Sequence, residues 1–201
     1  MNKADGRLYV EMKIMSLKKL AFLALIALTV IFAARVCLAD PCALVTKADA
    51  EKILGEAVKT PRKKMIKGMA AGQRCTYFTA APMAKRGGVG TLEIVEYDPQ
   101  TMAKESIMFK SPGKYFTRLY NTKKKAGAKL RDVQGLGNKA FWEPGLDAMH
   151  VMVKGTYFKV QVKDLVTVKG KTKSGVSRKV SAHRFKKAVQ VYKQFILPRA
   201  K

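Results

Sequence analysis

Side chains that could do chemistry are sparse in this chain of 201 residues, which has two histidines, His150 and His183, and three cysteines. A nucleophilic site needs a histidine close in space to a serine or cysteine, which sequence does not reveal, and the chain has no catalytic or cofactor motif. The histidines and cysteines also lack the spacing of metal ligands. We therefore predict no catalytic residue, no metal and no cofactor, and we expect that the protein is not an enzyme.

Other polar features have structural explanations. Gly135-Leu136-Gly137 lacks the longer glycine pattern and the Lys-Ser/Thr ending of a phosphate loop, so it predicts a tight turn. His150 is expected on the basic face of a hairpin, as a surface or packing residue. Four acids are too scattered for a catalytic carboxylate pair and are expected to be solvated: Asp132, Glu143, Asp147 and Asp164.

Residues 16–40 have the pattern of a secretory signal. Lys18 and Lys19 precede an uncharged run from Leu20 to Ala34, and Cys37-Leu38-Ala39 supplies small side chains for a peptidase. The run is shorter than the roughly 20 residues of a membrane span, so a retained anchor is the less favoured alternative. We predict cleavage after Ala39, with residues 1–14 as an upstream extension, and a periplasmic or extracellular location. Met15 is an alternative start.

The two cysteines that follow the signal, Cys42 and Cys75, predict one disulfide in an oxidising compartment. Two unpaired buried thiols are the alternative. Neither Cys37, after Val36, nor Cys42, after Pro41, fits the small-residue pattern of a lipidated cysteine. We therefore expect export without a lipid anchor.

The charge of the chain is strongly positive. The first 39 residues hold six basic and two acidic residues, so the 162 residues that follow carry +22 of the chain's +26. Such a surface attracts polyanions, and export argues against nucleic acid. We expect anionic lipid, lipopolysaccharide phosphates, an acidic cell-wall polymer or an acidic protein as partners. The candidate anion-binding residues are Arg62, Lys63, Lys64, Lys123, Lys124, Lys125, Lys186 and Lys187. The alternative is a solvated lysine surface without a specific ligand.

Periodicity places these residues on helices and strands. Helices are predicted where capping or three- and four-residue spacing occurs: from Thr46 to Gly55, over 101–110, from Ser111-Pro112 to about 123, and from His183 to Pro198. Strands are predicted at 74–78 and 91–97 and in a hairpin around Lys154-Gly155, with a basic strand edge and loop at 59–72. A glycine turn at 133–137 leads into Lys139-Ala140-Phe141-Trp142. A turn at 83–90 and a polar connector at 169–179 complete the pattern.

Clustered strands between helices predict one α+β domain over residues 40–201, with an antiparallel sheet, helices packed on one face, two layers and one disulfide. The apolar side of the last helix, with Phe185, Val189, Tyr192 and Phe195, is expected to pack on the apolar face of the hairpin.

Several short motifs occur in the order found in small exported proteins and lipoproteins of unknown function. The chain resembles them in Asp40-Pro41-Cys42-Ala43-Leu44-Val45-Thr46, in Cys75-Thr76-Tyr77, and in the Gly135-Leu136-Gly137 segment. This resemblance implies a compact secreted α+β domain with one disulfide, and it implies no catalytic residue.

Two functions are consistent with these observations. The first is a non-enzymatic exported binding domain whose basic surface contacts anionic envelope components or an acidic partner. The alternative is a small periplasmic hydrolase or other enzyme with an unrecognised site. A deep pocket holding His150 with an acid and a hydroxyl would favour the alternative.

Overall fold

The computed structural model describes residues 40–80, 89–164 and 173–199, and among these no helix is long and apolar enough to cross a membrane. The predicted signal at 1–39 therefore lies outside the described residues, as do positions 83–88 of the predicted turn and 169–172 of the connector.

Two short helices begin the described part. The Asp40 carboxylate accepts a hydrogen bond from the Cys42 N–H at the start of α2 (Pro41–Leu44). Thr46 and Asp49 form the predicted capping box of α3 (Lys47–Leu54), which ends at Gly55. The predicted Cys42–Cys75 disulfide is confirmed, and its Cα atoms lie 5.2 Å apart. It ties α2 to the sheet.

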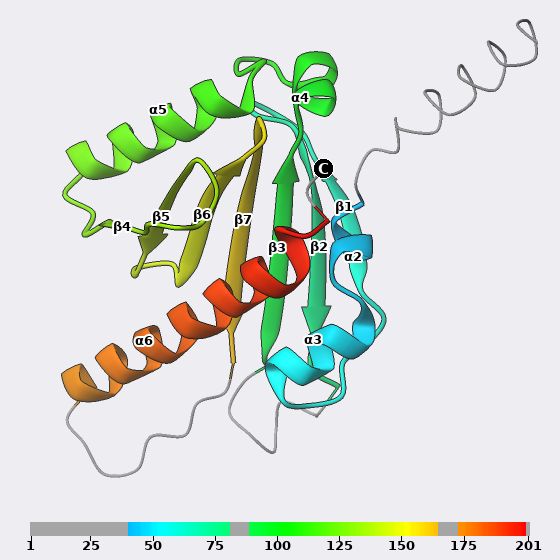
Figure 1. The fold of residues 1–201 in the computed structure, drawn as a ribbon, viewed down its shortest axis with the longest axis vertical. Coiled ribbons are helices and arrows are strands. Elements are labelled where there is room, and N and C mark those ends of the chain that lie inside the picture. Colours follow the sequence, from blue (N-terminus) through cyan, green and yellow to red (C-terminus); the bar gives the residue numbers. More distant parts are fainter. Residues whose placement is uncertain (1–39, 81–88, 165–172, 200–201) are drawn as a thin grey trace, which may run out of the picture. The chain divides into compact units, whose positions relative to one another are not determined.

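Seven antiparallel strands form one sheet in the order β1-β2-β3-β7-β6-β5-β4 (Figure 1). The strands are β1 (Arg62–Ile66), β2 (Gly72–Phe78), β3 (Thr91–Tyr97), β4 (Arg131–Asp132), β5 (Lys139–Glu143), β6 (Ala148–Val153) and β7 (Thr156–Lys163). The predicted β6–β7 hairpin turns at Lys154 and Gly155, which both have positive φ. A two-residue turn of this kind matches the twist of the strands it joins.

The main core lies between one face of the sheet and α2, α3 and α6 (Lys173–Val191), which continues as a π-helical turn, η2 (Tyr192–Ile196). Val151, Val153, Phe158, Val160 and Val162 form part of this core, which confirms the predicted contact between the last helix and the hairpin. The helix begins earlier than the predicted His183, because it includes part of the polar connector.

The opposite face of the sheet carries a second apolar cluster, covered by α4 (Pro99–Glu105) and α5 (Pro112–Lys125). Phe116 of α5 contacts Phe141 and Tyr157, which project from the face opposite to the main core. The α+β class and antiparallel sheet are thus confirmed, and helices lie on both faces rather than one. The reason is that Val95, Tyr97, Phe141 and Tyr157 make part of the second face apolar, and it needs its own cover.

Candidate functional site

The second sheet face holds a hydrogen-bonded network of acid, imidazole and phenol from three neighbouring strands. Glu143 ends β5, His150 lies in β6 and Tyr157 lies in β7. The distance from His150 Nε2 to Glu143 Oε2 is 3.2 Å, and that from His150 Nδ1 to Tyr157 Oη is 2.6 Å. Lys123 of α5 extends the network, because its Nζ donates to Glu143 Oε1 at 2.5 Å.

The protonation states of this network follow from its surroundings. Burial lowers the pKa of His150 and raises that of Tyr157 well above its usual value. Partial burial acts to raise the pKa of Glu143, but hydrogen bonds from His150 and Lys123 outweigh it and hold that pKa below its usual value. The network is therefore an ionised glutamate, a neutral imidazole that donates from Nε2, and a phenol that donates to Nδ1.

Although an acid, an imidazole and a hydroxyl are the groups of nucleophilic catalysis, this set is closed to solvent. His150 and Tyr157 are each 1% exposed, and the Phe141 ring stacks on the imidazole with centroids 4.3 Å apart. A phenol with a raised pKa is also a poor nucleophile at neutral pH. The network joins α5 to the sheet through the Lys123–Glu143 pair, and its imidazole and phenol are enclosed.

These positions correct two expectations. His150 is not on an exposed basic face, and Glu143 and Asp164 are buried and ion-paired rather than solvated. The network could not be predicted from the sequence. Strand alternation assigns each residue to a face of the sheet, but it does not say which face α5 covers. Tyr157, the hydroxyl of the network, had no sequence signal beyond its place in the hairpin.

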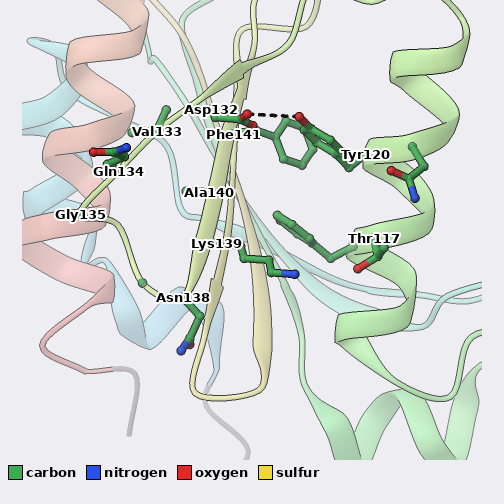
Figure 2. Close-up of a pocket in the computed structure, with 13 residues that line it drawn as sticks. Thr117, Tyr120, Asp132, Val133, Gln134, Gly135, Asn138, Lys139, Ala140 and Phe141 are labelled. Carbon is green, nitrogen blue, oxygen red and sulfur yellow. Dashed lines mark hydrogen bonds between the residues drawn. The ribbon is translucent and has the colours of Figure 1, made fainter.

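A cavity of about 560 Å³ lies beside the network, between α5 and the strands β4 and β5 (Figure 2). Tyr120 and Asp132 meet across it through a hydrogen bond of 3.3 Å. The turn at Gly135-Leu136-Gly137 borders it, as a tight turn rather than a phosphate loop, and a Cβ at Gly137 would collide with the Met152 carbonyl. His150 and Glu143 are not among the residues that line this cavity.

The candidate cations at Arg62, Lys63 and Lys64 lie on β1, the edge strand of the sheet. Lys63 Nζ lies 2.7 Å from Asp40 Oδ2, and the Arg62 guanidinium lies 5.2 Å from the centre of the Phe78 ring. Charged side chains on an edge strand also prevent pairing with strands of other molecules. This cluster therefore has a structural explanation.

Of the two candidate cations on α6, Lys187 is ion-paired and Lys186 is exposed. Lys187 Nζ lies 2.7 Å from Asp164 Oδ2, and the same carboxylate accepts from His183 Nε2 at 2.8 Å. Because α5 and α6 cover opposite faces of the sheet, the predicted cations do not form one continuous site.

The third cluster belongs to a larger basic surface on α5, a helix with five basic residues and no acidic one. Exposed Lys114, Arg118, Asn121 and Lys125 lie four, three and four residues apart, which places them on one side of the helix. We call these four residues the α5 outer face. Lys123 points away from it toward Glu143. Lys114 and Arg118 were not among the predicted cations, although their helical spacing is visible in the sequence.

The helix dipole distinguishes the two ends of α5. Lys123, Lys124 and Lys125 lie in the last turn, where positive side chains stabilise the partly negative end of a helix. Lys114 lies in the first turn, where a positive charge is unfavourable and where α5 has no acidic residue. Helix stability therefore explains the cations at the end of α5 and does not explain Lys114.

Within the described residues, no group of three or more histidine, cysteine or acidic side chains is placed to hold a metal ion. The sequence matches no protein-family model and, at a significant level, no curated protein or solved structure. The resemblance to small exported proteins thus stays an expectation from sequence motifs.

Proposed function

We propose that this protein is an exported, non-enzymatic domain that binds anionic envelope material through the α5 outer face. The observation that supports this most is Lys114, which places a positive charge where the helix itself disfavours one. Arg118 and Lys125 extend the positive surface along the same side of the helix. Phosphate and carboxylate groups repeated along a polymer or a membrane are the ligands that such a row of cations attracts.

The proposal gives a defined dependence on salt. Charges on an exposed helix interact with a ligand through solvent, and salt screens them over about 8 Å at physiological ionic strength. Binding should therefore be strongest at low salt and weaken steeply as salt is added. Electrostatic attraction by the whole molecule gives the same trend, so the test needs variants of equal net charge.

The experiment compares two triple variants. Lys114→Gln, Arg118→Gln and Lys125→Gln remove three charges from the α5 outer face. Lys52→Gln, Lys59→Gln and Lys193→Gln remove three exposed charges elsewhere, as the matched control. Affinity is measured at low salt for soluble polyphosphate, for phosphatidylglycerol vesicles and for neutral phosphatidylcholine vesicles.

We expect the α5 variant to lose about tenfold or more in affinity for the anionic ligands, and the control to lose much less. Equal losses in the two variants would mean that net charge alone causes binding, and would contradict the proposed site. Wild-type protein that binds neither anionic ligand at low salt would contradict the proposed function as a whole.

A further inference from the structure

Three large apolar side chains lie exposed on two adjacent loops. Ile107 is 80% exposed, and Met69 and Met108 are each 62% exposed. Met69 belongs to the loop between β1 and β2, and the other two belong to the segment that joins α4 to α5. We call these three residues the apolar tip. Exposed apolar side chains are ordinary when single, but a group of three at one place indicates an interaction surface.

Hydrogen bonds hold the two loops together, so the tip is a built feature of the fold. The backbone N–H of Ile107 donates to the Gly68 carbonyl at 2.9 Å, and that of Met108 donates to the Met69 carbonyl at 3.2 Å. The buried Ser106 hydroxyl accepts from the Ala71 N–H at 2.7 Å. These bonds present the apolar side chains in one arrangement, which lowers the entropy cost of binding.

Behind the tip, apolar and polar contacts anchor the same segment to the second cluster. Phe109 packs on Tyr115, with ring centres 5.2 Å apart, so this residue turns inward while its two predecessors stay outside. Lys110 Nζ donates to the Ser106 carbonyl at 2.6 Å and to the Ala103 carbonyl at 3.2 Å, at the C-terminal end of α4. The exposure of Ile107 and Met108 is thus set by a packed neighbour on each side.

Cations flank the tip along the chain. Lys67 precedes the Gly68-Met69 pair, Lys110 lies two residues after Met108, and Lys114 opens the α5 outer face four residues later. The acid nearest in sequence is Glu105, whose carboxylate lies 3.8 Å from Lys104 Nζ. Apolar side chains flanked by cations match an anionic bilayer, whose head groups are negative and whose acyl chains are apolar.

We propose that the apolar tip inserts into the head-group region of an anionic lipid bilayer while the neighbouring cations contact the lipid phosphates. This inference rests on the proposed function and deepens it, because it selects a lipid surface from among the anionic materials that the α5 outer face could bind. In Figure 1, α4 and α5 lie at the same end of the sheet, so the segment that joins them brings the tip next to the basic helix. Insertion of apolar side chains adds a part of the binding that salt does not screen.

The experiment uses variants of unchanged charge. The tip variant combines Ile107→Ser and Met108→Ser, which removes two of its three apolar side chains. The matched control combines Leu146→Ser and Leu197→Ser, at two exposed leucines elsewhere. Co-sedimentation with phosphatidylglycerol vesicles is measured at low and at high salt, and binding to soluble polyphosphate is measured in parallel. Sedimentation velocity without vesicles records the oligomeric state of each protein.

We expect wild type and control to keep a salt-resistant fraction of vesicle binding, and the tip variant to lose about tenfold or more of it. Polyphosphate binding should be equal in all three proteins. Wild type that binds polyphosphate but not vesicles, or a tip variant that binds vesicles like wild type, would overturn the insertion and leave the proposed function standing. A change in oligomeric state with unchanged vesicle binding would instead make the tip a contact between copies, and would also overturn it. Wild type that binds neither ligand would remove the proposed function itself.

Discussion

Glu96 is a carboxylate in an apolar position of β3, where it is 3% exposed. Its Oε2 has no hydrogen-bond partner within the described part of the chain. Burial raises its pKa to about 8, and the charges of Asp98 and Asp40 act in the same direction. The side chain is therefore largely protonated at neutral pH in the folded protein, whereas in the unfolded chain it is ionised.

This residue predicts that part of the stability is lost as the pH rises. Because the folded-state pKa is raised, the contribution of Glu96 is fully present below about pH 4.5 and is lost as pH rises toward about 8. Glu96→Gln should gain up to about 1.4 kcal/mol per pH unit over wild type across this window. Urea unfolding at several pH values measures the difference. A difference that does not change with pH would mean that Glu96 keeps an ordinary pKa.

His150 and His183 form an internal pair for testing accessibility. His150 is 1% exposed and enclosed by Phe141 and Tyr157, whereas the His183 side chain is 45% exposed. We expect diethyl pyrocarbonate to modify His183 in the folded protein and to reach His150 only on unfolding. Peptide mass spectrometry assigns the modified residue. Rapid modification of His150 in the folded protein would show that solvent reaches the network, and would favour the enzymatic alternative.

At the scale of elements, the last helix shows how packing selects among apolar side chains. Ala188, Val191, Tyr192 and Ile196 are fully buried, whereas the predicted contacts Phe185, Val189 and Phe195 are only partly buried. The π-helical turn, closed by a hydrogen bond from the Leu197 N–H to the Tyr192 carbonyl, changes the direction of the residues after Val191. Tyr192 and Ile196 consequently face the sheet.

This packing predicts unequal costs of truncation. Ile196→Ala should lower the free energy of unfolding by about 2–5 kcal/mol, because it leaves a cavity in the main core. Phe195→Ala should cost less, since part of that ring is in contact with solvent in the folded protein. Chemical denaturation of both variants tests the order. If Phe195→Ala lowered the free energy of unfolding more than Ile196→Ala, then Phe195, and not Ile196, would be the residue that packs on the sheet.

Across the whole molecule, the proposed cleavage after Ala39 is compatible with the fold. Removal of residues 1–39 would leave Asp40 at the start, where its carboxylate caps α2 and pairs with Lys63. The disulfide two residues later would fasten this new end to β2. Cleavage at Ala39 thus leaves the first stabilising contact of the domain intact.

N-terminal sequencing of the exported protein tests this arrangement directly. We expect a single N-terminus, which begins Asp40-Pro41-Cys42. A mature protein that still contains Leu20 to Ala34 would show that this run is a membrane anchor, and would contradict cleavage.

Patterns that act over a few residues were readable from the sequence alone. The Thr46–Asp49 capping box, the alternation in Thr91–Tyr97 and the Lys154-Gly155 turn each depend on near neighbours, and the structure confirms all three. The cysteine pairing was equally accessible, since two cysteines allow a single connectivity.

Tertiary structure alone decided which faces are covered and which charges are paired. Lys123 pairs with Glu143 across 20 positions, and Arg184 with Asp147 across 37, so neither cation could be recognised as occupied from its neighbours. The same holds for His150, whose burial depends on a helix that covers the second sheet face. Composition determined that this protein is strongly basic, but the fold determined that Lys114, Arg118 and Lys125 lie together on one exposed side of α5. The energy of a charge depends on what lies within a few ångströms of it.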